Sequence, residues 1–115
     1  MAGETLHEDP DKLDAQILDR HRAISTLMEE LEAIDWYDQR IKASENAELQ
    51  SILRHNRDEE KEHASMLLEW LRRNDECFDR HLRTYLFSTG PIRESAAADP
   101  GSGDGNLAIG SLRRG

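Results

Sequence analysis

The sequence Asp58-Glu59-Glu60-Lys61-Glu62-His63-Ala64 places charged residues in the middle of a helical face that is otherwise apolar. The apolar residues on either side recur at steps of three and four, which is the spacing of one face of an α-helix. That face runs through Leu49, Leu53, Asn56, Glu60, His63, Leu67 and Trp70. A carboxylate or an imidazole at a buried position costs several kcal/mol unless a partner compensates for its lost hydration. Because Glu60 and His63 lie one turn apart on the same face, both can contribute to one site.

Composition limits the class of protein. The chain has 115 residues, of which 34% are charged and 37% hydrophobic, and this fits one small helical domain. A single pair of helices has almost no interior, so we expect a homo-oligomer. The net charge of −9 argues against nucleic acid and membrane surfaces as partners, and it is compatible with attracting cations. Cys77 is the single cysteine, and the first residues do not resemble a signal peptide. We therefore expect a cytoplasmic protein without a membrane span.

Three helices are predicted, so the expected fold class is all-α. They span about 10–42, 47–73 and 76–87, with turns at 44–46 and 74–75. Asp9 is the expected cap of the first helix, with Pro10 at its first helical position. The expected organisation is a flexible N-terminus over 1–10, a helical domain over 11–90, a flexible linker over 91–106 and an apolar segment over 107–115.

Two of these helices bring distant carboxylates together. Long helices joined by a short turn must lie antiparallel. With the turn centred at Glu45, Glu30 and Glu60 are equally far from it along the chain, so they lie at the same height. His63 is about one turn away on the second helix. The sequence therefore predicts that Glu30, Glu60 and His63 converge.

These three residues form half of a known ligand set. Four-helix di-iron bundles use two single glutamates and two Glu-x-x-His motifs, and a twofold dimer of this chain would supply both halves. The expected fold is therefore a ferritin-like half bundle, completed to four helices by dimerisation. Carboxylates and imidazoles without thiolates favour iron over structural zinc. The alternative is chance, because Glu-x-x-His also occurs in ordinary charged helices.

Further residues on the first helix flank this cluster. Glu29 and Glu32 form an acidic patch with Trp36 one turn later, which could attract cations on their way to the site. A solvated helix face is the alternative. Tyr37 lies two turns after Glu30 and could hydrogen-bond a metal ligand, although it could also be an ordinary core tyrosine.

A second acidic stripe lies on the other helix. His55, Glu59 and Glu62 follow one another at spacings of four and three, which places them on one outward face. They could hold calcium or another divalent cation at a peripheral site. A surface charge network is the alternative explanation.

Several stretches resemble the encapsulated ferritins, a family of ferritin-like proteins. They are MEELEAIDWYDQR at 28–40, HNRDEEKEHA at 55–64 and EWLRRND at 69–75. The resemblance covers about residues 11–90. The terminal stretch LAIGSL at 107–112 resembles the peptide that loads cargo into encapsulin shells.

The resemblance implies an activity, an assembly and a set of residues. Members of the family are ferroxidases with two long helices and a short third one. Their di-iron centre, with two ions, forms between two chains, and the dimers close into a ring that is a pentamer of dimers. By the resemblance, Glu30, Glu60 and His63 stand at the positions of the iron ligands, and Tyr37 stands beside them. Glu29, Glu32 and Trp36 stand at the positions of the metal access route.

The resulting hypothesis is a ferroxidase that oxidises Fe(II) with dioxygen or peroxide for iron storage inside an encapsulin nanocompartment in the cytoplasm. Leu107, Ile109 and Leu112 would bind the encapsulin shell protein. The alternative is a non-catalytic helical metal-binding cargo or adaptor protein whose acidic cluster only binds cations.

Overall fold

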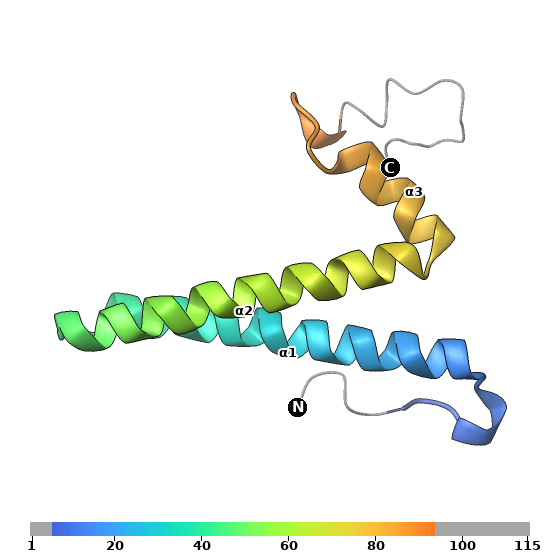
Figure 1. Ribbon diagram of the computed structural model, residues 1–115, viewed down its shortest axis with the longest axis horizontal. Helices are drawn as coiled ribbons and strands as arrows, with labels where there is room; N and C mark the ends of the chain where they lie inside the picture. The colour runs from blue at the N-terminus through green and yellow to red at the C-terminus, as the bar shows by residue number, and fades with distance from the viewer. Residues whose placement is uncertain (1–5, 94–115) are drawn as a thin grey trace. The chain divides into compact units, whose positions relative to one another are not determined.

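A computed structural model describes residues 6–93, and all regular structure in that part of the chain is helical (Figure 1). The elements are the short 3-10 helix η1 (Pro10–Lys12), α1 (Ala15–Ala43), α2 (Ala47–Arg73) and α3 (Glu76–Tyr85). The predicted all-α class is confirmed, and the bounds predicted for the second helix match α2. None of the helices within residues 6–93 combines the length and apolar character that a membrane crossing requires.

The start of the first helix differs from the prediction. Asp9 does cap a helix that begins at Pro10, but this helix is only η1, and Leu13 then takes an extended conformation. Asp14 begins a new helix, because its carboxylate accepts a hydrogen bond from the backbone N–H of Ile17 at 2.8 Å. The predicted continuous helix from residue 10 is therefore wrong, since a second capping aspartate divides it.

Helices α1 and α2 lie antiparallel and side by side (Figure 1), and side chains fix their register near both ends. Near the turn, the Gln50 amide donates to the backbone carbonyls of Ile41 and Ser44 and so satisfies the last turn of α1. Near the other end of the pair, Arg20 on α1 donates to the carbonyl of Asn74, the C-cap of α2, at 3.1 Å. The hairpin therefore has one defined register, which sets the relative heights of all side chains on the two helices.

The core between the two helices is small. The buried apolar residues of residues 6–93 are Ala23, Ile41, Ala64 and Leu71. Many larger apolar side chains on the same two helices are exposed, namely Ile17, Ile24, Met28, Leu31, Trp36, Leu49, Ile52, Met66 and Trp70. Each of these side chains would lose contact with water if another surface packed against it. The face that the sequence identifies as apolar is thus only partly covered within one chain.

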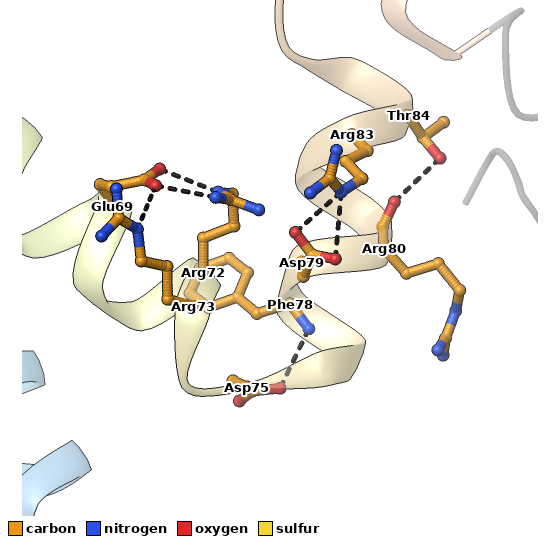
Figure 2. Close-up of polar contacts among 9 residues, drawn as sticks. All are labelled: Glu69, Arg72, Arg73, Asp75, Phe78, Asp79, Arg80, Arg83 and Thr84. Carbon is orange, nitrogen blue, oxygen red and sulfur yellow. Dashed lines mark hydrogen bonds and ion pairs between the residues drawn. The ribbon is translucent and has the colours of Figure 1, made fainter.

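The third helix forms its own local contacts. The Asp75 side chain accepts from the backbone N–H of Phe78 and caps α3, and an ion pair joins Asp79 to Arg83 (Figure 2). The helix ends at Tyr85, two residues before the predicted end at Phe87. Phe87 has a φ of 61°, in the left-handed region that is uncommon for residues other than glycine, so the helix cannot continue through it.

The last turn of α2 carries a compact charge cluster. Glu69 accepts two hydrogen bonds from Arg72 at 2.8 Å and one from Arg73 at 2.7 Å (Figure 2). These contacts lower the pKa of Glu69 to about 2, with Arg72 the larger cause. Cations near the last turn also interact favourably with the helix dipole, so this cluster stabilises the end of α2.

Candidate metal centre

Glu30 from α1 meets Glu60 and His63 from α2. The Nδ1 atom of His63 lies 3.0 Å from Oε1 of Glu60 and 3.4 Å from Oε1 of Glu30. Potential ligand atoms of the three residues all lie within 4.8 Å of one another. Among residues 6–93, no other group of three or more histidines, cysteines and carboxylates gathers as closely. Two helices and one tight turn therefore suffice to build the cluster.

The three side chains perturb one another's protonation. Hydrogen bonding with Glu60 raises the pKa of Glu30, and burial and the charge of Glu60 act in the same direction. The same hydrogen bond lowers the pKa of Glu60, with a further contribution from His63. The pKa of His63 is raised, chiefly by its hydrogen bond to Glu60. Two carboxylates this close disfavour each other's ionisation, and a cation bound between them would relieve that repulsion.

One oxygen of the cluster lacks a hydrogen-bond partner. Oε1 of Glu30 is buried and accepts no hydrogen bond, although His63 lies within ion-pair distance. The geometry explains this, because Nδ1 of His63 can carry only one proton and its hydrogen bond is with Glu60. A buried acceptor without a donor is unfavourable by about 1–3 kcal/mol. A metal ion would supply the missing positive charge at this oxygen.

The cluster is also open on one side. The side chains of Glu30 and Glu60 are 20% and 25% exposed, whereas that of His63 is 47% exposed. The sequence placed Glu60 and His63 on a buried face, and within one chain that expectation is wrong for His63. The two-helix pair has too little interior to cover both sides of α2. The donor set of two carboxylates and one imidazole fits iron, and it lacks the thiolates typical of structural zinc.

The residues predicted for the access route lie elsewhere on α1. Glu29 and Glu32 are half-buried, and no three-ligand group in the described residues includes them. Trp36 is 47% exposed and Tyr37 is half-buried. The guanidinium of Arg40 lies over the rings of both aromatic residues. The structure thus links Trp36 to Tyr37 through a residue that the sequence analysis did not single out.

The second acidic stripe forms a pair rather than a cluster of three. Nε2 of His55 lies 3.2 Å from a carboxylate oxygen of Glu59, and both side chains are more than half exposed. Glu62 is exposed and lines a shallow hollow on α2 with Met66 and Trp70. A peripheral cation at these residues stays a prediction. The shell-binding residues Leu107, Ile109 and Leu112 lie outside the described residues.

Sequence reasoning also missed an ion pair between the helices. Arg57 on α2 lies 3.0 Å from Asp38 on α1 and 3.2 Å from its neighbour Asp58. The height argument that matches Glu30 with Glu60 places Ala33 opposite Arg57, so it gave no signal for a contact with Asp38, which lies nearer the turn. The pair joins the helices one turn before Glu60, and it helps to fix the register on which the cluster depends.

A glutamate from one helix and a Glu-x-x-His pair from the next form half of a ferritin-like bundle. The comparisons with known proteins agree with this class. A family model described as EncFtn-like matches residues 5–89, and the chain belongs to that family.

Relatives and a solved structure support the assignment over most of the chain. The chain is 52% identical to an encapsulated ferritin-like protein from Rhodospirillum rubrum, with 98% of this chain and 91% of the relative covered. It is 46% identical to a ferritin-like protein from Thermotoga maritima, with 92% and 96% covered. A crystal structure of a protein from Nitrosomonas europaea superposes with a TM-score of 0.75 at 54% identity, covering 77% of this chain and 98% of the other.

Proposed function

We propose that the chain is a ferroxidase whose di-iron centre forms where two copies bring their Glu30, Glu60 and His63 side chains together. The observation that carries the proposal is the convergence of these ligands, with the buried Oε1 of Glu30 among them accepting no hydrogen bond. A single copy presents three ligands and an open side, which is half of the set used by di-iron bundles. A twofold axis beside this cluster would double it to four carboxylates and two imidazoles.

Fe(II) is the substrate in this proposal, with two ions at each dimer interface. The carboxylates of Glu30 and Glu60 bind the ions, and their negative charge favours the Fe(III) product over Fe(II). Each Fe(II) loses one electron, and dioxygen or peroxide accepts the electrons. Hydrogen bonding raises the pKa values of Glu30 and His63, so protons would compete with the metal for these ligands as the pH falls.

Neighbouring residues would control access and position. Glu29, Glu32 and Trp36 would lie on the route by which Fe(II) reaches the centre, and Tyr37 would hydrogen-bond a ligand from beside it. His55, Glu59 and Glu62 would hold calcium or another divalent cation at the periphery, where the close pairing of His55 with Glu59 already concentrates charge.

Iron storage would require a second component. The relative from Rhodospirillum rubrum bears the name encapsulated ferritin-like protein, and this supports a place for the present chain inside an encapsulin nanocompartment in the cytoplasm. Leu107, Ile109 and Leu112 would bind the inner wall of the shell. The dimers would close into a ring, a pentamer of dimers. Such a ring would carry many copies of the terminal segment, so weak binding by each copy would add up to stable attachment to the shell. The exposed apolar side chains of α1 and α2 support such an assembly, because contact between copies would remove part of this surface from water.

Aerobic oxidation of Fe(II) tests the proposal. The full chain, Glu60→Ala and His63→Ala would be mixed with Fe(II) in air, and Fe(III) formation followed by absorbance. Both variants are expected to lose most of the activity and to keep their helical content. His81→Ala removes an exposed histidine of α3 that lies outside all the proposed metal sites, and it is the control, which should oxidise Fe(II) at the native rate.

The alternative function is a non-catalytic metal-binding cargo or adaptor protein. Such a protein would bind Fe(II) at the same cluster but would not accelerate its oxidation. Native rates in Glu60→Ala or His63→Ala would contradict the assignment of the site, and a native chain that binds iron without accelerating its oxidation would favour the alternative.

A further inference from the structure

One arginine on α1 covers two aromatic side chains at once. The guanidinium carbon of Arg40 lies 5.9 Å from the ring centroid of Trp36 and 5.7 Å from that of Tyr37. Both distances fall within the range of about 6 Å in which a cation is attracted to the face of an aromatic ring. The spacing allows this, because residues three and four positions earlier on a helix lie side by side beneath the same side chain. Arg40 therefore bridges the two rings.

The two rings differ in how firmly the protein holds them. Tyr37 is half-buried, whereas Trp36 is 47% exposed and lines a shallow hollow of about 310 Å³ with Gln39 and Arg40. An exposed side chain normally exchanges between staggered rotamers. In the described part of the chain, no carboxylate forms an ion pair with Arg40, so the rings are the contacts of its guanidinium. The half-buried tyrosine can thus anchor the arginine, and the arginine can hold the exposed indole.

We propose that Arg40 is a positioning residue that holds the indole of Trp36 in one orientation on the metal access route. The inference rests on the proposed function, which assigns Trp36 to that route. The positive charge of Arg40 repels divalent cations, so its contribution is the orientation of the ring and not attraction of the metal. A planar guanidinium can stack on two ring faces, and the ammonium group of lysine cannot do so equally well.

The first test measures the indole directly and uses no iron. The chain has two tryptophans, so Trp70→Phe leaves Trp36 as the single fluorophore. Acrylamide quenching of Trp36 would be compared in this parent, in Trp70→Phe/Arg40→Gln and in Trp70→Phe/Arg40→Lys. Loss of the contact between Arg40 and the indole should raise the population of freely exchanging Trp36 rotamers by about two- to fivefold. The quenching constant should rise as well. The lysine variant should give an intermediate value.

The control is Trp70→Phe/Arg22→Gln, which removes an exposed arginine of the same helix that pairs with Asp19. It should quench like the parent. If Arg40→Gln also quenches like the parent, Arg40 does not hold the indole and the proposal is overturned.

The second test separates access from chemistry. Initial rates of Fe(II) oxidation would be measured against Fe(II) concentration in the same parent and variants. Arg40→Gln should raise the Fe(II) concentration that gives half the maximal rate by about two- to fivefold. The maximal rate should be unchanged, because Glu30, Glu60 and His63 remain.

An unchanged half-saturating concentration, or a loss confined to the maximal rate, would contradict the positioning role. A parent that fails to oxidise Fe(II) would instead contradict the ferroxidase function. Acrylamide quenching reports the contact of Arg40 with Trp36 whether or not the protein oxidises Fe(II). Failure of the positioning role can therefore be told apart from failure of the ferroxidase function.

Discussion

Nδ1 of His63 on α2 lies 3.4 Å from Oε1 of Glu30 on α1, close enough for an ion pair across the two helices. The contact depends on the register of the hairpin, which Gln50 fixes near the turn and Arg20 fixes near the other end. A shift of one residue along either helix would move the side chains by about 1.5 Å in height and rotate them away from each other. The convergence of Glu30 with His63 therefore depends on the register of the hairpin.

The first prediction concerns the charge of Glu30. Glu30→Gln keeps the size of the side chain but removes the carboxylate that lies beside the charge of Glu60. Without metal, the variant should be at least as stable as the native chain, because the repulsion between the two carboxylates is lost. Its affinity for Fe(II) should fall by more than the roughly 10- to 100-fold that is typical when a residue supporting a metal ligand is changed. Thermal unfolding and anaerobic Fe(II) titration measure the two effects. Native affinity in the variant would remove Glu30 from the ligand set.

The second prediction is a pH dependence of stability that comes from Glu69. Arg72 and Arg73 lower its pKa in the folded chain from 4.5 to about 2. A carboxylate with a depressed folded pKa contributes stability above its unfolded pKa and loses it as the pH falls through the folded value. The native chain should therefore be more stable than Glu69→Gln at pH 6, and the difference should vanish between pH 4.5 and about 2. Denaturant unfolding across this range tests the sign. A difference that grows as the pH falls would contradict it.

The third prediction concerns the ion pair between Asp38 and Arg57. A double-mutant cycle with Asp38→Asn and Arg57→Gln should show a larger coupling free energy than the same cycle at Asp19 and Arg22. The side chain of Arg57 is 23% exposed, whereas that of Arg22 is 69% exposed, so water screens the second pair more strongly. Equal coupling in the two cycles would mean that Asp38 and Arg57 contribute nothing special to the register.

The sequence predicted the turns well, because their signals are local. Asn46 and Asp75 lie in the predicted turns at 44–46 and 74–75, and each caps the helix that follows it. The convergence of Glu30 with Glu60 followed from chain distances alone, since a tight turn leaves one antiparallel arrangement. The division at Leu13 was missed because the apolar spacing continues through it, and the capping by Asp14 interrupts the backbone without changing that spacing.

Exposure was harder to predict than helix position. Periodicity identifies an apolar face but not which neighbour covers it, so Trp70 and His63 were placed in a core that one chain does not have. The contacts of Arg40 and Arg57 depend on rotamers, and many charged residues occur at the same spacing in this chain. The sequence alone does not distinguish these two arginines from the others, whereas the structure shows their contacts.

The fourth prediction concerns the terminal segment. Deleting residues 107–115 should leave Fe(II) oxidation unchanged and should abolish co-purification with a co-expressed encapsulin shell, because Leu107, Ile109 and Leu112 are the apolar residues proposed to bind it. Burial of three such side chains contributes about 1.5–3 kcal/mol each, before the cost of ordering the segment. Encapsulation of the truncated chain at the full-length level would contradict the proposed role of the segment.

The most direct test of the central claim is native mass spectrometry of the full chain under anaerobic conditions, with and without Fe(II). If each chain carries half of a di-iron centre, Fe(II) should shift the population towards dimers and larger even-numbered assemblies with two iron ions per dimer. The reason is that a shared centre would bring the carboxylates of both copies together, and two cations would reverse their repulsion. His63→Ala should show neither the shift nor the stoichiometry. Iron bound to single chains, or an oligomer distribution unchanged by bound iron, would contradict a metal centre shared between two copies.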